Sequence, residues 1–405
     1  MKTELHPKYA EAEWAAEAEE IIRNCVHCGF CTATCPTYQE LGDERDGPRG
    51  RIYLIKQFLE EGTATANTMR HLDRCLTCRS CETTCPSGVQ YGRLVDLGRH
   101  AIEQEVPRPI IGRFARWALL RVLPHRQRFG ILLRIGQFLQ PVLPRFFSKK
   151  IPGRQKPKDW PEKQHDRVML VLGGCAQAAA TPNTNVSAAR VLDRLGISLL
   201  EPDGGGCCGA ASYHLSAHDR ARDHARRNID TWWPLIEQGA ESIVITASGC
   251  GTMVKDYGTL LKADRNYAEK AEIVSRITHD LSEVLNSEDT SVLEIVEWTE
   301  KVAIHCPCSL HHGQQLPGIV EGILTSLGVR TASTKEKHLC CGSAGTYSIL
   351  QPKISGELLE RKLKALTIED PDEIVTANVG CQMHLGTESK VPVRHWIELV
   401  DQITS

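Results

Sequence analysis

Two stretches near the start of the chain decide its organisation. They read Cys25-Val-His-Cys28-Gly-Phe-Cys31-Thr-Ala-Thr-Cys35-Pro36 and Cys75-Leu-Thr-Cys78-Arg-Ser-Cys81-Glu-Thr-Thr-Cys85-Pro86. Both follow the spacing C-x2-C-x2-C-x3-C-P, in which three closely spaced thiolates can wrap three corners of a [4Fe–4S] cube. The proline after the fourth cysteine fixes φ and lacks an N–H, so the chain turns away from the loop at that point. The repeated pattern predicts two [4Fe–4S] clusters.

The fourth cysteine of each run is expected to serve the cluster of the other run, as in two-cluster ferredoxins with this spacing. The two predicted ligand sets are Cys25, Cys28, Cys31 and Cys85, and Cys75, Cys78, Cys81 and Cys35. A structural zinc site usually takes its cysteines from two separated C-x2-4-C pairs, and disulfides need an oxidising compartment. Both alternatives fit the spacing less well than iron–sulfur clusters do.

Length and composition set the broad class of the protein. The chain has 405 residues, enough for two or three domains, and its 41% hydrophobic and 24% charged residues are typical of soluble globular proteins. No apolar run is long enough to span a bilayer, and the first fourteen residues lack the apolar segment of a secretory signal. We therefore expect the reducing cytosol, where seventeen cysteines indicate metal binding rather than disulfides.

Residues 1–105 are expected to form a mainly helical ferredoxin domain. Helix-forming residues predict a helix from about Lys8 to Asn24, and the long connection between the two cysteine runs leaves room for an amphipathic helix after residue 51. The charged segment 42–51 contains three arginines, Arg45, Arg49 and Arg51. We interpret them as charges of a solvated loop; the alternative is that they offset the negative charge of a cluster. His27 and His71 are assigned no role.

Residues 106–166 are predicted to form a basic amphipathic linker. Thirteen lysines and arginines, and no acidic residue, lie within 106–158: Arg108, Arg113, Arg116, Arg121, Arg126, Arg128, Arg134, Arg145, Lys149, Lys150, Arg154, Lys156 and Lys158. Phenylalanine, tryptophan and leucine alternate with them, for example at Phe114, Trp117, Phe146 and Phe147. This combination is typical of helices that lie on an anionic membrane surface. The alternatives are docking to an acidic partner or to the acidic rest of the chain; nucleic-acid binding is not expected, because no reader motif is present.

From residue 167 the chain is predicted to be a duplicated α/β domain, with the copies at 167–290 and 291–405. In the first copy short apolar strands at 168–172, 197–200 and 243–246 alternate with helices, and in the second copy strands at 302–305, from 329 and at 373–377 do so. This alternation predicts parallel sheets covered on both faces.

The cysteines of the two copies match in position. Those of the first copy are Cys175, Cys207, Cys208 and Cys250, and those of the second are Cys308, Cys340, Cys341 and Cys381. Each follows the carboxyl end of a predicted strand, and these ends meet at one edge of a parallel sheet. Each set is therefore provisionally predicted to form a metal site, with an iron–sulfur centre in at least one. The alternative is a group of reduced, buried thiols.

Together these features resemble the family of glycolate oxidase (glycolate dehydrogenase) iron–sulfur subunits. The paired cysteine runs, the segment Gly-Asp-Glu-Arg-Asp-Gly-Pro-Arg-Gly-Arg-Ile, the two Cys-Cys-Gly repeats and the ending Val-Arg-His-Trp-Ile-Glu-Leu-Val carry the resemblance, which covers essentially the whole chain. It implies an electron-transfer component of an oxidoreductase that acts on CH–OH groups with an acceptor other than NAD. Separate FAD-containing subunits would oxidise glycolate to glyoxylate, and this chain, with no catalytic residue of its own, would pass electrons to a membrane quinone at the cytoplasmic face of the inner membrane.

Related families leave alternatives open. The same Cys-Cys-Gly repeats occur in iron–sulfur subunits of glycerol-3-phosphate dehydrogenase, of lactate utilisation and of heterodisulfide reductase. A self-contained reductase of the last kind would end each repeat with C-x-x-C, whereas this chain has Cys250-Gly-Thr-Met253 and Cys381-Gln-Met-His384. That departure favours electron relay over disulfide cleavage. The repeats could also be a structural scaffold for a flavin subunit.

Overall fold

The computed structural model describes residues 1–144 and 148–404. Arg145, Phe146 and Phe147, which the sequence assigns to the basic segment, lie outside the described residues. The chain divides into two compact units: Met1–Ala118 with His338–Lys362, and Leu119–Lys337 with Leu363–Ser405. We call them unit 1 and unit 2. The four-segment division expected from the sequence stays a prediction.

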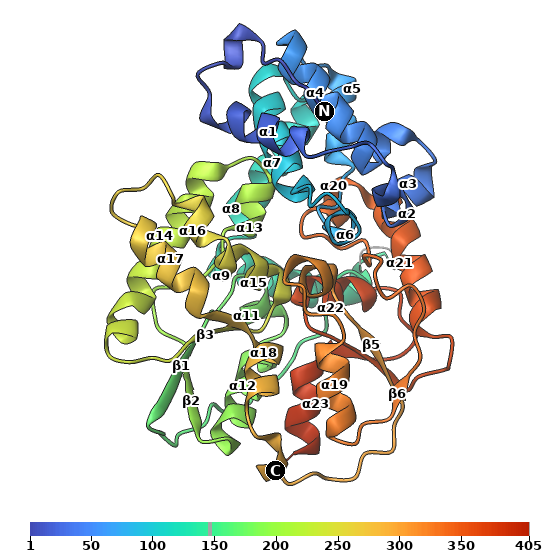
Figure 1. The fold of residues 1–405 in the computed structure, drawn as a ribbon. Coiled ribbons are helices and arrows are strands. Elements are labelled where there is room, and N and C mark those ends of the chain that lie inside the picture. The colour runs from blue at the N-terminus through green and yellow to red at the C-terminus, as the bar shows by residue number, and fades with distance from the viewer. Residues whose placement is uncertain (145–147, 405) are drawn as a thin grey trace. The chain divides into compact units, whose positions relative to one another are not determined.

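Unit 1 is helical (Figure 1). Its longer helices are α1 (Glu13–Arg23), α4 (Pro48–Glu61), α5 (Ala66–Asp73) and α7 (Tyr91–Glu105), and its shorter ones are η1 (Pro7–Tyr9), α2 (Phe30–Ala33), α3 (Pro36–Leu41), η2 (Glu44–Asp46), α6 (Ser80–Thr83) and α20 (Tyr347–Leu350). Apolar residues at helical spacing form one buried core, which includes Ile22, Ile55, Leu59, Leu72 and Leu94. The prediction of a mainly helical ferredoxin-type domain is confirmed.

The basic segment forms two amphipathic helices, α8 (Ile110–Val122) and α9 (Arg126–Leu139), followed by η3 (Gln140–Val142). Neither α8 nor α9 has a buried residue. Large apolar side chains are exposed at Ile110, Phe114 and Trp117 on α8 and at Ile131, Ile135 and Phe138 on α9. Their spacing of three and four residues places them along one face of each helix. Among the described residues, no helix combines the length and apolar character needed to cross a bilayer.

Unit 2 contains two four-stranded parallel sheets. The first, in the order β2-β1-β3-β4, consists of β1 (Arg167–Val171), β2 (Ile197–Leu200), β3 (Ile243–Ile245) and β4 (Thr278–Asp280); the second, in the order β6-β5-β7-β8, consists of β5 (Val302–His305), β6 (Thr331–Ala332), β7 (Glu373–Thr376) and β8 (Val393–His395). The identical order confirms the duplicated α/β architecture with parallel sheets. Sequence analysis missed β4 and β8, one of the two edge strands in each sheet, because they are three residues long and partly polar.

The helices of unit 2 cover the sheets. Those of the first copy are α11 (Gln177–Ala180), α12 (Asn183–Arg194), α13 (Ala210–His214), α14 (His218–Glu237), α15 (Ser248–Lys255), α16 (Tyr257–Leu260), α17 (Ala268–Ile277) and α18 (Leu281–Ser287); the linker to the second copy has η4 (Thr290–Val292), and the second copy has η5 (Ser309–Gly313), α19 (Ile319–Ser326), α22 (Val379–Leu385) and α23 (Trp396–Ile403). Helix α21 (Pro352–Leu366) crosses the boundary between the units.

The two copies share a hydrophobic core. Helices α12, α18, α19 and α23 lie between the two sheets (Figure 1), and Val171, Leu192, Val302, Leu324 and Trp396 are buried together in this layer. On the opposite face of the first sheet, apolar residues of β1 and β3 pack against α14, α15 and α17 around the buried Trp232. Alternate residues of β1 face the two cores, as the period of two in a strand requires.

A buried carboxylate in this layer ties the copies together. Asp401 on α23 accepts hydrogen bonds from Arg190 Nε and Arg194 Nη2 on α12, both at 3.0 Å, and from Ser187 Oγ at 3.1 Å. Lys158 Nζ, from the basic segment, lies 2.9 Å from the same carboxylate. Burial disfavours the ionised form, but the hydrogen bonds from Lys158 and Arg190 hold the pKa of Asp401 below its usual value. The carboxylate is therefore charged at neutral pH and paired with cations of the first copy.

We predict that Asp401→Asn lowers the free energy of unfolding of unit 2 by about 2 kcal/mol, because it weakens the charged hydrogen bonds that the carboxylate accepts, while Lys158 and Arg190 remain partly exposed to water. Urea unfolding followed by circular dichroism measures the change. Asp219→Asn is the control: Asp219 pairs with Arg222 at the surface and is 93% exposed, so we expect no measurable effect. An Asp401→Asn protein as stable as the wild type would contradict the structural role of the network.

Candidate metal centres

The two ferredoxin-type loops have the same backbone shape. His27 and Gly29 in the first loop have φ of 56° and 86°, and Thr77 and Arg79 at the matching positions of the second have φ of 53° and 59°. Non-glycine residues seldom adopt this left-handed conformation, so its occurrence at matched positions indicates a functional constraint. It curls each loop tightly, and in the second loop the Thr77 N–H donates to Cys75 Sγ at 3.4 Å.

One cavity of unit 1 is lined by the first predicted ligand set. Cys25, Cys28, Cys31 and Cys85 all border an empty volume of about 420 Å³, part of which is open to solvent, and Cys81 of the other predicted set borders it too. Cys85 of the second run thus lies at the same cavity as three cysteines of the first, and the assignment of ligands to each cluster stays a prediction. Cys28 is exposed and Cys25 is buried. Four thiols around one cavity are the donor set that a [4Fe–4S] cluster needs, so these residues fit such a group.

The second predicted ligand set lies deeper. Cys75, Cys81 and Cys35 are buried, and Cys78 is half-buried. Burial raises the pKa of the Cys81 thiol well above its usual value, and the neighbouring Cys78, Cys75 and Cys35 add to that shift. The Tyr91 hydroxyl donates to Cys75 Sγ at 3.6 Å. The structure therefore brings Cys35 of the first run to the three cysteines of the second, and this donor set also suits an iron–sulfur cluster.

The arginines of segment 42–51 differ in burial. The side chains of Arg45 and Arg49 are 51% and 37% exposed and pair with Asp43 and Glu44, whereas Arg51 is completely buried. The interpretation of a solvated loop is wrong for Arg51. It begins the second turn of α4, where Gly50 lets the chain approach closely: a Cβ at that position would lie 2.0 Å from the Glu44 carbonyl oxygen. This close packing turns Arg51 into the interior.

The four cysteines of the first repeat lie together at the carboxyl edge of its sheet. Hydrogen bonding to Cys207 raises the pKa of the Cys175 thiol, and burial adds to the effect. Cys207 also bonds to Cys208, which in turn bonds to Cys250 at the start of α15. The thiols thus form a connected series that begins after β1, passes through the loop after β2 and ends after β3. This arrangement can bind a metal or an iron–sulfur centre.

Both Cys-Cys-Gly loops are shaped by their glycine. Gly209 and Gly342 have φ of 93° and 89°, and the N–H of each donates to the sulfur of the first cysteine, Cys207 at 3.4 Å and Cys340 at 3.5 Å. A Cβ would lie 3.1 Å from the Ala221 carbonyl oxygen at the first glycine and 2.6 Å from that of Ser355 at the second. Any larger residue would strain both loops.

The sheet register shows which residues of the two copies correspond. Val171 of β1 pairs with Val244, and Ile304 of β5 pairs with Val375. Counting from these pairs, Cys175 corresponds to Cys308 and Cys250 to Cys381. The same count places His305 and Cys306 opposite Leu172 and Gly173. The second copy therefore has a histidine and a cysteine where the first has neither.

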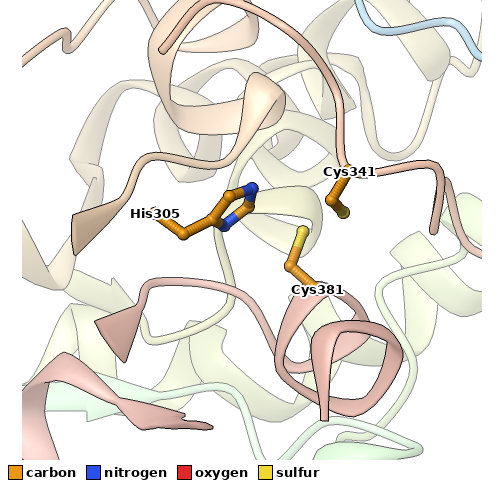
Figure 2. Close-up of side chains that lie close together, drawn as sticks. All are labelled: His305, Cys341 and Cys381. Carbon is orange, nitrogen blue, oxygen red and sulfur yellow. The ribbon is translucent and has the colours of Figure 1, made fainter. Parts of the chain in front are cut away.

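Sequence analysis missed His305. This residue ends β5 and is buried, and its Nδ1 lies 2.9 Å from Thr376 Oγ1. A ring nitrogen of His305 lies within 4.8 Å of Cys381 Sγ. Figure 2 shows the two side chains close together. Cys381 also accepts a hydrogen bond from Asn378 Nδ2 at 3.3 Å. Imidazole nitrogen and thiolate sulfur are both common metal ligands. The signal in the sequence was a histidine directly after a buried apolar run, which taken alone is more often structural.

Comparison with known families assigns both regions. The family model described as a 4Fe–4S dicluster domain matches residues 21–89, and that described as a cysteine-rich domain matches residues 169–255 and 302–386. These matches span one ferredoxin-type region with both cysteine runs and two Cys-Cys-Gly repeats.

Relatives cover nearly the whole chain. It is 52% identical to the glycolate oxidase iron–sulfur subunit of Escherichia coli (strain K12) over 99% of both chains. It is 30% identical to the probable glycolate oxidase iron–sulfur subunit of Bacillus subtilis (strain 168), covering 96% of this chain and 94% of that one. Lactate utilization protein A of the same Bacillus subtilis strain is 28% identical, and the match covers 54% of this chain and 93% of that protein.

One solved structure shares the fold. The crystal structure of a hypothetical protein from Helicobacter pylori matches with a TM-score of 0.57 at 9% identity, over 98% of this chain and 73% of that one. At this identity the likeness concerns the fold alone.

Proposed function

The chain belongs to the family of glycolate oxidase iron–sulfur subunits, and on that premise we propose that it relays electrons from glycolate, oxidised on partner subunits, to a membrane quinone. Its general role, an iron–sulfur electron-transfer component of an oxidoreductase, follows from its relatives and its matched domains. The observation that supports the proposal is that both cysteine runs lie in one helical unit, where Cys85 borders the cavity of the first run and Cys35 lies near Cys81 of the second.

We assign Cys25, Cys28, Cys31 and Cys85 to one [4Fe–4S] cluster and Cys75, Cys78, Cys81 and Cys35 to the other. Oxidation of glycolate to glyoxylate releases two electrons and two protons, and bound [4Fe–4S] clusters carry one electron at a time. The exposed Cys28 brings the first quartet near solvent, where a partner can approach. Burial of Cys75, Cys81 and Cys35 excludes water from the second quartet, and the Tyr91 hydroxyl and the Thr77 N–H orient Cys75.

The partners we propose are FAD-containing dehydrogenase subunits. The name of the Escherichia coli relative describes one subunit of a glycolate oxidase, so other subunits must supply the site where the hydroxy acid reacts. Lactate and glycerol 3-phosphate are the alternative substrates, the first because lactate utilization protein A is also related to this chain.

We further propose that at least one Cys-Cys-Gly repeat holds an additional iron–sulfur centre. The connected thiols of Cys175, Cys207, Cys208 and Cys250 support this for the first copy. The matched sequence positions Cys308, Cys340, Cys341 and Cys381 extend it to the second. Side chains of adjacent cysteines tend to diverge, so this centre would be irregular rather than a regular cube.

Helices α8 and α9 support peripheral attachment to the cytoplasmic face of the inner membrane. Their exposed apolar faces suit an interfacial position. The contribution of charge is smaller than the thirteen basic residues suggest, because at least five of them pair within the chain: Arg108, Arg116, Arg126, Lys149 and Lys158. The apolar faces therefore carry more of this proposal than the charges do.

Cysteine substitutions in the complex purified with its flavin subunits test the relay. We predict that Cys25→Ser and Cys75→Ser each remove one [4Fe–4S] signal in electron paramagnetic resonance and abolish quinone reduction. Flavin bleaching by glycolate should survive in both, because that step precedes the clusters. Cys306→Ser, at a position with no cysteine in the first repeat, is the control and should retain both signals.

Two results would contradict the proposal. Either variant retaining both clusters and full quinone reduction would refute the ligand assignment. Faster flavin bleaching by lactate or glycerol 3-phosphate than by glycolate, or a preparation without flavin, would refute the proposed substrate or partner.

Iron analysis tests the repeats. Two cubes account for about eight irons per chain, so we predict clearly more than that in the wild type and a loss in Cys208→Ser and Cys341→Ser. Cys306→Ser again serves as the control and should keep the wild-type iron content. About eight irons in the wild type, unchanged in the first two variants, would show that the repeat thiols hold no iron.

Membrane flotation tests the attachment. We predict that Phe114→Glu combined with Phe138→Glu moves the complex from the membrane to the soluble fraction, because each change places a charge on an exposed apolar face. Val292→Glu, at an exposed apolar residue between the two repeats, should leave it bound. A double variant that stays on the membrane but loses its flavin subunits would show that the helices dock a protein partner instead.

A further inference from the structure

The two cysteine quartets of unit 1 lie in different charge environments. The difference begins with Arg51, whose guanidinium is completely buried. Its Nε donates to the His71 carbonyl at 2.7 Å, its Nη1 to Thr37 Oγ1 at 3.1 Å, and its Nη2 lies 3.4 Å from Asp46 Oδ1. Since a buried charge is costly unless it is fully hydrogen-bonded, this set of partners holds the cation in a fixed position.

That position lies beside Cys35. Thr37 Oγ1, which accepts from Arg51, lies 3.3 Å from Cys35 Sγ, and the same hydroxyl donates to the Asp46 carbonyl at 2.7 Å. Burial opposes the charge of Arg51, but Tyr91, Cys75, Cys35 and Asp46 outweigh it and hold the pKa of Arg51 above its usual value. The guanidinium is therefore charged and is coupled to two cysteines of the deeper quartet.

The surrounding charges do not cancel this cation. The buried Asp46 carboxylate is shared by two arginines, because Arg74 Nη1 also donates to its Oδ2 at 2.8 Å. His71 Nδ1 lies 2.9 Å from Asp46 Oδ1. Asp43, Asp46 and His71 come close enough to hold a cation, but the arginines already use the Asp46 oxygens. Two guanidiniums against one carboxylate leave the network with a net positive charge.

The other quartet lacks an equivalent buried charge among the described residues that border its cavity. Arg49 borders that cavity, but its Nε lies 2.6 Å from Glu44 Oε1 and both side chains are more than a third exposed. An ion pair in contact with water is neutral overall and screened by solvent. Arg49 therefore acts on its quartet far more weakly than Arg51 acts on the deeper one.

We propose that Arg51 raises the reduction potential of the centre held by Cys75, Cys78, Cys81 and Cys35 above that of the centre held by Cys25, Cys28, Cys31 and Cys85. Reduction adds one negative charge, and a fixed cation in a medium of low dielectric stabilises the charge it adds. The electron then resides preferentially on the deeper centre. Arg51 thereby sets the direction of electron flow between the two centres, as a positioning residue. This inference rests on the ligand assignment of the proposed function.

Two substitutions with opposite expected signs test it. In the purified complex, Arg51→Gln should lower the midpoint potential of the signal that Cys75→Ser removes, and Asp46→Asn should raise it, because the first loses a positive charge and the second a negative one. The signal that Cys25→Ser removes should stay in place in both. Arg49→Gln is the matched control and should move neither potential appreciably. Redox titration followed by electron paramagnetic resonance measures both midpoint potentials in the wild type and in each variant.

The outcomes separate an electrostatic role from a structural one. If the network only supports the fold, Arg51→Gln and Asp46→Asn would shift the potential in the same direction or not at all, and either result overturns the inference. If Arg51→Gln loses iron, Arg51→Lys and Asp46→Asn test the inference instead. Arg51→Lys keeps the charge and should hold the potential near the wild-type value. A wild-type chain without two cubane signals would overturn the proposed function and this inference with it.

Discussion

In the ligand assignment we propose, the exchange of the fourth cysteine between the two runs is the constraint on which unit 1 depends. Cys85 must reach the loop that contains Cys25, and Cys35 must reach the loop that contains Cys75. Neither loop can then be completed without the other, so the helices between them have to hold both at fixed separation. The left-handed residues recur at matched positions of both loops, and the close approach at Gly50 brings α4 against Glu44 of η2.

Features with a local sequence pattern could be predicted from the sequence, whereas features that depend on tertiary surroundings could not. The cysteine spacing predicted the 4Fe–4S dicluster domain, and alternating apolar runs predicted six of the eight strands that the described residues form, because both signals are local. Strands β4 and β8 are short and contain His279 and Arg394, so only pairing with a neighbouring strand reveals them. Arg51 resembled its exposed neighbours in a charged segment, and its burial follows from the packing of α4 against η2. His305 escaped notice because only the sheet register places it near Cys381.

The two copies of the duplicated domain are more alike in backbone geometry than in the side chains at the carboxyl edges of their sheets. The strand order, the glycine conformation and the N–H to sulfur contact recur in both copies. Side chains at the carboxyl edges have diverged: Leu172 and Gly173 correspond to His305 and Cys306, and Met253 corresponds to His384. The two copies thus carry different side chains at matching positions of one backbone plan.

The contact between α12 and α23 has a consequence for how the protein is made. Arg190 and Asp401 are 211 residues apart in sequence, and the core helix of the first repeat packs against the last helix of the chain. A ribosome synthesises α23 long after α12, so the first repeat must wait with part of its apolar surface uncovered. Long-range closure of this kind slows folding. Loss of α23 would therefore damage the repeat that is synthesised first.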